Sequence, residues 1–297
     1  MVSKLDVYQA SELGERESNE DVHCVKLNIG PDGTAIDYRY ANIDYFSICD
    51  GHGGDRVSKI VSKLMLPKIM NPKNSFPLKK SDIDRYYGSV SDKLVEKYQS
   101  VSNFCGTTML IIIRYIRKNR EYVQAINLGD CRAVLSSDGF GMSLTKDHKP
   151  SWPEEKQRIM NINKQLGISE LPGMHHIDFY EGDWRVNNLS VSRAFGDLTC
   201  KPQISHIPDA FSYILDSRSE FLIMGCDGLW DVMDCQEASN FVCDYLSNNY
   251  FRTFEIYRGR RIAVDTDTDV ADALAKYAIQ LGSMDNVTVI VIVFKRT

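Results

Sequence analysis

Four aspartates in this chain of 297 residues each stand at one end of an apolar, strand-like run: Asp50, Asp130, Asp227 and Asp285. Because they are far apart in the sequence, no single helix or loop accounts for them. Carboxylates that converge on one point repel each other unless cations neutralise their charge. Ligand sets made only of oxygen atoms suit Mg²⁺ or Mn²⁺. The first hypothesis is therefore a hard-metal site for phosphate chemistry.

The pentapeptide from Asp50 to Gly54 has the residue types that such a site needs. Gly51 has no side chain, so its carbonyl group can approach a cation closely. His52 would lie beside the metal, where an imidazole can transfer protons near neutral pH. A helix would begin near Gly54, and a helix N-terminus tolerates phosphate. The plain alternative is a glycine-rich turn with an exposed histidine.

The other aspartates have weaker individual signals. Asp231 follows Asp227 by one helical turn and can face the same site, although it could equally cap a helix. Asp285 and Asp130, each taken alone, could be turn residues. Only their combination favours a shared site.

Arg16 is followed closely by two further acidic residues, Glu20 and Asp21. Its guanidinium group offers two parallel donors for phosphate oxygens, close to these carboxylates. Taken alone, Arg16 could equally be a surface residue.

The composition is that of an ordinary globular protein, with 43% hydrophobic and 25% charged residues. A chain of this length fits one large domain or two small ones, and its core needs no staples. The net charge of −5 argues against a nucleic-acid-binding protein, which would normally be basic.

Eight cysteines are present, without a CxxC pair or a zinc-site spacing, so we expect reduced thiols that are mostly buried. The N-terminus has no apolar signal-peptide core, and no run reaches the ~20 apolar residues that span a bilayer. We expect a soluble monomer in the cytoplasm or the nucleus, without a membrane or nucleic-acid partner.

The expected fold class is α+β, a four-layer αββα sandwich. Short turns at Asp32-Gly33, Lys118-Asn119 and Asp138-Gly139 join neighbouring strands, which favours antiparallel sheets. Each predicted helix has one apolar stripe, so helix pairs should cover two β-sheets from outside. The predicted strands are 22–29, 39–49, 107–116, 121–128, 131–136, 188–193, 220–226 and 286–294. The first predicted helix follows Gly54 and has stopped by Asn71-Pro72, and the others are about 81–101, 236–249 and 268–281.

We expect a single domain over residues 1–297, with a surface flap inserted at about 146–187. This segment is the least regular part of the sequence, since prolines interrupt it. It also contains a charged helical stretch near 153–165.

Taken together, the motifs resemble the metal-dependent, type 2C family of serine/threonine protein phosphatases. The resemblance spans nearly the whole chain, and its motifs are specific in combination. The family's fold is a β-sandwich flanked by helix pairs, which agrees with the expected layers. The matching segments, in the family's order, are Arg16–His23, Phe46–Gly54, Cys105–Met109, Asn127–Arg132, Leu144–Pro150, Leu189–Asp197, Leu222–Met233 and Ser283–Phe294.

The resemblance implies two core ions, Mn²⁺ or Mg²⁺. Asp50 would bridge both ions, and Gly51 would give its carbonyl group to one of them. Asp227 and Asp285 would bind the other ion.

The remaining acidic residues would have supporting roles by the same resemblance. Glu20 and Asp21 would act through metal-bound water or from just behind the ligands. Asp130 and Asp231, with Asp227, match a third, weaker metal position.

Arg16 and His52 would be the catalytic residues, since the resemblance implies that Arg16 holds the phosphoryl oxygens and His52 protonates the leaving alkoxide. Two metal ions about 3.5–4 Å apart lower the pKa of a bridging water enough to supply hydroxide near pH 7. Hydroxide would attack phosphorus in line, while positive charge stabilises the equatorial oxygens. No covalent phosphoenzyme is needed, so no cysteine is required as a nucleophile.

The flap departs from the family pattern. The expected Gly-Gly pair is replaced by Gln165-Leu166-Gly167 and a longer stretch through His175 and His176. Because the flap borders the substrate approach in relatives, the departure bears on substrate choice and not on the chemistry. The two histidines could suggest a metal-ligand pair, but an exposed polar flap is the simpler interpretation.

The leading hypothesis is a phosphatase for phosphoserine and phosphothreonine in proteins, with phosphoproteins as partners. The alternative is a catalytically inactive, phosphatase-like binding module, but such a protein should have lost a core aspartate, the histidine or the arginine. A nuclease or another two-metal phosphoesterase is opposed by the acidic balance and by the lack of a basic, aromatic-studded groove.

Overall fold

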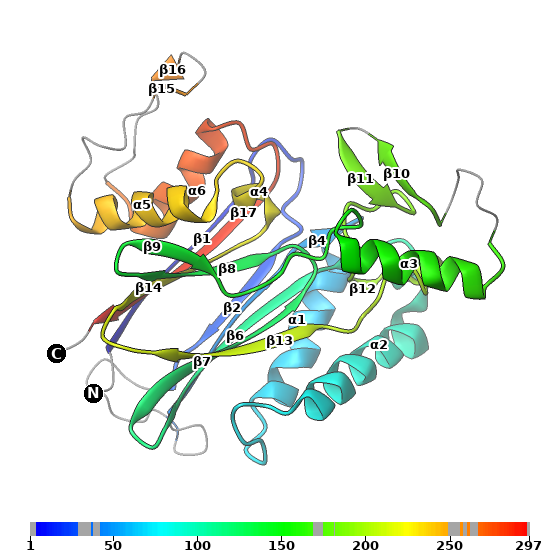
Figure 1. The fold of residues 1–297 in the computed structure, drawn as a ribbon, viewed down its shortest axis with the longest axis horizontal. Coiled ribbons are helices and arrows are strands. Elements are labelled where there is room, and N and C mark those ends of the chain that lie inside the picture. The colour runs from blue at the N-terminus through cyan, green and yellow to red at the C-terminus, as the bar shows by residue number, and fades with distance from the viewer. Residues whose placement is uncertain are drawn as a thin grey trace.

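A computed structural model describes residues 4–28, 37, 42–168, 175–180, 182–248, 256–257, 260–261 and 267–295. Two five-stranded sheets face each other, and a pair of helices covers the outer face of each (Figure 1). Every strand pair within these two sheets is antiparallel. The predicted α+β sandwich of four layers is confirmed.

Each sheet gathers strands from distant parts of the chain. The first sheet has the order β1 (Lys4–Glu12), β17 (Val287–Lys295), β14 (Ser219–Gly225), β8 (Arg132–Ser137) and β9 (Phe140–Ser143), and it is covered by α5 (Cys235–Leu246) and α6 (Val270–Gln280). The second has the order β13 (Asp209–Leu215), β7 (Arg120–Leu128), β6 (Met109–Arg117), β3 (Ile43–Cys49) and β2 (Val22–Lys26), and it is covered by α1 (Arg56–Ile69) and α2 (Lys80–Ser102).

Side-chain alternation along the central strands builds three apolar layers. On β17, Val289 and Val291 pack towards α5 and α6, whereas Ile290 and Ile292 pack between the sheets. Successive side chains of a strand point to opposite faces, so a strand that is covered on both faces must be apolar throughout. The uninterrupted apolar run before the C-terminus therefore has a structural cause.

Smaller elements lie at one end of the sandwich (Figure 1). They are α3 (Pro153–Gln165), the hairpin of β10 (Ile177–Tyr180) and β11 (Asp183–Val186), the three-stranded sheet β12 (Phe195–Gly196), β5 (Gly106–Thr107) and β4 (Gly51–His52), and the short helix α4 (Asp227–Trp230). A further pair, β15 (Ile256–Tyr257) and β16 (Arg260–Arg261), lies beyond α5. Among the described residues, no helix has the length and apolar character needed to cross a bilayer.

The predicted hairpin turns can be checked at two of three places. Lys118-Asn119 and Asp138-Gly139 each place two successive residues at positive φ, and they join β6 to β7 and β8 to β9. Two such residues give the turn twist that matches paired strands. These two predictions are confirmed, while Asp32-Gly33 lies outside the described residues.

The predicted strand at 188–193 is wrong. Within it only Leu189 and Arg193 form isolated bridges. Asn187 and Asn188 both have positive φ, which turns the chain out of β11. Ser192 then donates from its backbone N and its Oγ to the His148 carbonyl oxygen, so the segment is tied to a loop instead of a sheet.

One buried ion cluster links three neighbouring strands of the second sheet, β3, β6 and β7. Arg114 on β6 donates from Nη1 to Asp44 Oδ2 at 2.5 Å and from Nε to Glu121 Oε1 at 3.1 Å. All three side chains are at most 3% exposed. Removing the Arg114 guanidinium group would leave the buried carboxylates of Asp44 and Glu121 without this positive charge.

We expect Arg114→Met to lower the free energy of unfolding by about 3–5 kcal/mol, because breaking a buried ion pair leaves the partner carboxylates buried without a compensating charge. Urea unfolding measures the difference. The matched control is Arg85→Met, which removes the exposed ion pair with Asp82 and should cost about 0–1 kcal/mol. Equal losses in the two variants would contradict the buried role of Arg114.

Candidate metal centre

A cavity of about 1000 Å³ opens where the two sheets end beside α4 and the flap hairpin. It collects side chains from segments that are far apart in the chain. Of the ten residues predicted as ligands or catalysts, nine line it: Arg16, Glu20, Asp50, Gly51, His52, Asp130, Asp227, Asp231 and Asp285. The tenth, Asp21, has ligand atoms within 4.8 Å of those of Asp50 and Cys226.

Asp50 is fixed by hydrogen bonds of its own backbone. It follows β3 directly, and its carbonyl oxygen accepts from Thr108 N and from Thr107 Oγ1, both at 2.9 Å. Its backbone N donates to Thr108 Oγ1 at 3.2 Å. The main chain of Asp50 is thus held by two residues of the neighbouring segment, and the residue lines the cavity.

Asp227 and Asp285 are brought together because β14 and β17 are neighbours. Asp227 begins α4 immediately after β14, and Asp285 lies just before β17. The Cys226 backbone N donates to the Thr288 carbonyl oxygen at 3.2 Å, which ties the two strand ends. Asp231 lies one turn further on, where its N donates to the Asp227 carbonyl oxygen at 2.8 Å.

Asn286 anchors the loop that carries Arg16 and Glu20. Its Nδ2 donates to the carbonyl oxygens of Leu13 and Ser18, at 2.9 and 3.1 Å. Its Oδ1 accepts from Glu20 N at 2.9 Å. One amide side chain therefore joins the first strand–loop segment to the last strand.

Glu20 lies against the start of α1. Its Oε2 accepts from Gly54 N at 2.9 Å, and its carbonyl oxygen accepts from Ser58 Oγ at 2.7 Å. A Cβ atom on Gly51 would lie 2.5 Å from that carbonyl oxygen, so this position has no room for a side chain. The close approach of the two backbones explains the glycine beside Asp50.

The carboxylates destabilise one another's charged forms. Burial and the charge of Asp227 raise the pKa of Asp50 well above its ordinary value, and burial and the charge of Asp130 do the same for Asp227. Burial raises the pKa of Asp21 to about 6, with further contributions from Asp285 and other acidic neighbours.

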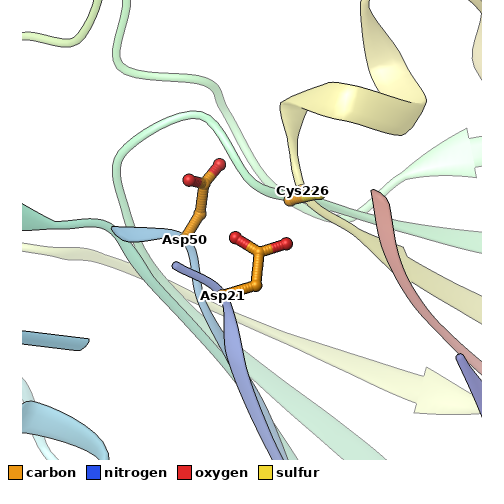
Figure 2. Close-up of side chains that lie close together, drawn as sticks. All are labelled: Asp21, Asp50 and Cys226. Carbon is orange, nitrogen blue, oxygen red and sulfur yellow. The ribbon is translucent and has the colours of Figure 1, made fainter. Parts of the chain in front are cut away.

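The donor set fits hard divalent cations. Asp50, Asp130 and Asp227 have ligand oxygens within 4.8 Å of one another. Figure 2 shows the carboxylates of Asp21 and Asp50 pointing in the same direction, with Cys226 beside them. Asp21 Oδ2 and Asp130 Oδ1 are buried and have no hydrogen-bond partner. Buried carboxylate oxygens without donors are what a cation would satisfy.

Cys226 does not add a soft ligand to this set. Its sulfur donates to the Asn286 carbonyl oxygen and accepts from Thr288 N, both at 3.2 Å. Burial, with the charges of Asp21 and Asp50, raises the pKa of the thiol well above its ordinary value. A neutral thiol engaged in this way leaves oxygen atoms as the donors.

Lys149 lies among the carboxylates and was not predicted. Its Nζ donates to Asp130 Oδ2 at 2.5 Å. Burial lowers its pKa, but the charges of Asp130, Asp227 and Asp231 outweigh this and leave the pKa raised. The lysine therefore supplies a fixed positive charge at the predicted third metal position.

Arg16 and His52 each have a carboxylate partner. Arg16 Nη2 donates to Asp285 Oδ2 at 2.7 Å, and its side chain is 57% exposed at the rim. His52 Nε2 lies 2.8 and 2.9 Å from the two carboxylate oxygens of Asp197. Burial lowers the pKa of His52, but the hydrogen bond and charge of Asp197 leave it raised.

Neither Asp197 nor Lys149 was singled out from the sequence. Both lie in segments without helical or strand periodicity, after Gly196 and before Pro150. A signal was present only in the motif resemblance, which includes both segments but assigns neither residue a role.

The pH dependence of the metal-free protein follows from the raised pKa of Asp21. Between about pH 4 and pH 6 the folded state binds more protons than the unfolded state, so the free energy of unfolding falls as pH rises. In EDTA, the melting temperature of Asp21→Asn should therefore rise relative to wild type across this window. Calorimetry at several pH values measures the difference.

Asp84→Asn is the control, since Asp84 is an exposed partner of Lys80 on α2. Its melting temperature should run parallel to that of wild type. Adding Mn²⁺ at pH 7 should raise the melting temperature of wild type, because a ligand that binds only the folded state stabilises it. Parallel pH curves for wild type and Asp21→Asn would contradict the repulsive cluster.

Comparison with known proteins gives one consistent result. A family model described as "Protein phosphatase 2C" matches residues 7–287. The "PP2C-like domain-containing protein R307" of Acanthamoeba polyphaga mimivirus is 48% identical over 180 residues, which are 60% of this chain and 97% of that protein. "Probable protein phosphatase 2C 59" of Oryza sativa subsp. japonica is 30% identical over 286 residues, 96% of this chain and 74% of that protein.

Solved structures share the fold. The crystal structure of serine-threonine phosphatase 2C from Toxoplasma gondii superposes with a TM-score of 0.71 at 21% identity. The match covers 99% of this chain and 96% of that one.

Proposed function

The chain belongs to the protein phosphatase 2C family, and we propose that it hydrolyses phosphoserine and phosphothreonine monoesters in proteins, using divalent cations and no covalent phosphoenzyme. The observation that carries this proposal is the cavity itself. It combines a cage of carboxylates with an arginine at its rim and a histidine in its wall.

We propose that the metal ligands are acidic residues and a carbonyl group that line the cavity. Asp50 and the carbonyl group of Gly51 would hold one Mn²⁺ or Mg²⁺ ion, and Asp227 and Asp285 would hold a second together with Asp50. When bound, such ions supply a water that loses its proton near neutral pH, and positive charge for the phosphoryl group. The residues proposed to assist them are Glu20 and Asp21 through water, and Asp130 and Asp231 at a third, weaker position.

Arg16 is proposed to bind the phosphoryl oxygens. Among the described residues, its exposed side chain is bonded to Asp285 alone at the rim, so it can turn towards an incoming phosphate. A guanidinium group pairs two donors with two phosphate oxygens, which orients the phosphorus for in-line attack. His52 then donates a proton to the serine or threonine oxygen as the ester bond breaks.

The substrate polypeptide is proposed to approach on the His52 side of the cavity, because the leaving alkoxide must face the proton donor. Phe104, which is 75% exposed, lies on this side against Gly53. Asp183 and Arg185 of the flap hairpin border the opening. We propose that the chain forms one phosphatase domain. Its flap, residues 146–187, would thus select among phosphoproteins.

The cysteines support a mechanism without a thiolate nucleophile. Burial raises the pKa of Cys131 and Cys226 well above its ordinary value, so both thiols stay neutral at pH 7. No cysteine is among the described residues that line the cavity.

An inactive binding module is the alternative, but it would have no need of a complete set of ligands, arginine and histidine. We propose a monomer of the cytoplasm or nucleus, without nucleic-acid partners.

We expect Mn²⁺-dependent hydrolysis of p-nitrophenyl phosphate and of a phosphothreonine peptide. EDTA should abolish both activities, and Asp227→Asn should lower kcat/KM by at least about 100-fold, since even outer partners of metal ligands cost 10–100-fold. The control is Asp84→Asn, which should match wild type. Activity that survives EDTA or Asp227→Asn would defeat the proposal, and inactivity of wild type with any divalent cation would favour the binding module.

The proton-donor role of His52 predicts a dependence on the leaving group. p-Nitrophenolate leaves without protonation, whereas phenolate or an alkoxide needs a proton. His52→Gln should therefore lower kcat/KM for phenyl phosphate by about 10²–10⁴-fold and leave p-nitrophenyl phosphate much less affected. Steady-state kinetics on the two substrates measures the ratio, and equal slowing would remove this role.

A further inference from the structure

The His52 ring meets a buried carboxylate through one nitrogen only. Nε2 lies 2.8 Å from Asp197 Oδ2 and 2.9 Å from Oδ1, and Asp197 is 3% exposed. Within the described residues, Nδ1 of His52 forms no hydrogen bond, while the ring lines the cavity. The two ring nitrogens therefore have different surroundings, because Nε2 is fixed on Asp197 and Nδ1 has no hydrogen-bond partner among the described residues.

The small sheet β4–β5–β12 brings these two side chains together. His52 on β4 is the register partner of Gly106 on β5, and Gly106 is in turn the partner of Gly196 on β12, just before Asp197. A Cβ atom on Gly106 would lie 2.1 Å from Asp197 Oδ2 and 2.4 Å from His52 Nε2. Position 106 in the central strand β5 must be glycine, because a side chain there would collide with the His52–Asp197 pair.

Asp197 is held in a conformation that few side chains adopt. Its φ is 48° and its ψ is 45°, in the left-handed region that only Gly, Asn and Asp enter readily. Its N donates to the Cys105 carbonyl oxygen at 3.1 Å, and its carbonyl oxygen accepts from Cys200 N at 2.8 Å. The backbone thus aims this carboxylate at one target.

A second histidine–aspartate pair shows the contrast. His148 Nε2 lies 3.2 Å from Asp209 Oδ2, but its Nδ1 accepts from Gly129 N at 3.0 Å. His148 is buried and is absent from the cavity lining. With both ring nitrogens occupied, that pair is structural, whereas His52 keeps one nitrogen for chemistry.

We infer that Asp197 is the positioning residue for His52: it holds Nε2–H, so that Nδ1 is the atom that gives its proton to the leaving alkoxide. The inference rests on the proposed function. As the bond from phosphorus to the serine or threonine oxygen breaks, its electron pair goes to that oxygen, which takes the Nδ1 proton. The ring carries a proton on both nitrogens before this step and becomes neutral afterwards, with Nε2–H still on Asp197; a proton from solvent then restores Nδ1–H.

Asp197→Asn tests this inference, because asparagine tolerates the left-handed backbone. Its amide oxygen can accept Nε2–H but lacks the charge that supports a protonated ring. We expect kcat/KM for phenyl phosphate to fall by about 10–100-fold, and that for p-nitrophenyl phosphate to change little. In the His52→Gln background, Asp197→Asn should add no further loss, because its effect passes through the ring.

The matched control is Asp209→Asn, which removes the carboxylate of the other pair. It should leave the ratio of the two substrates at the wild-type value, and any general loss should persist in the His52→Gln background. Thermal melting of each variant checks that it is folded. Equal slowing of both substrates by Asp197→Asn, or an undiminished loss in the double variant, would overturn the inference.

A measurement on the unaltered protein keeps the test independent of folding. In the Mg²⁺-loaded enzyme, ¹⁵N NMR of the neutral His52 ring should place the proton on Nε2. A proton on Nδ1 instead would overturn the inference. The proposed function fails separately, if the wild type lacks divalent-metal-dependent activity on both substrates.

Discussion

The whole arrangement depends on holding carboxylates closer together than their charges allow. Asp50 and Asp227 are partly buried beside other aspartates, and burial with mutual repulsion raises the pKa of both. Their own interaction drives them apart, so the rest of the fold must hold them. The free energy for this comes from the apolar layers, in which β3, β14 and β17 are packed on both faces. Strand ends are suited to the task, because a paired strand moves little.

Lateral ties then make the strand ends act as one unit. Asn286 joins the last strand to the loop that carries Arg16 and Glu20. The backbone of Asp50 is bonded to Thr107 and Thr108. Both ties use neutral donors and acceptors, so they order the charged groups without adding to the charge. A cation that enters the cage meets ligands already in place, and little ordering remains to oppose its binding.

The sequence predicts what depends on local pattern, and misses what depends on pairing across the chain. Asp50 and Asp227 are recognisable because each ends a run buried on both faces. The edge strands β1 and β13 were not predicted, since each has one neighbour and only partial burial, which leaves a weak apolar signal. Asp197 was missed for another reason. Its partner His52 is 145 positions away, and only the register of β4, β5 and β12 reveals the pair.

Two of the cations that line the cavity, Lys149 and Arg16, differ in a way that suits two tasks. Lys149 is 18% exposed and bonded to the buried Asp130, whereas Arg16 is 57% exposed and bonded to the partly exposed Asp285. A compact ammonium held deep in the cage offsets part of the repulsion permanently. A planar guanidinium at the rim loses little by exchanging one carboxylate for a phosphate, because both accept the same pair of donors. If the two residues were exchanged, a mobile guanidinium would lie among the carboxylates, where a fixed positive charge is needed. The electrostatics of the carboxylate cage therefore explains their positions.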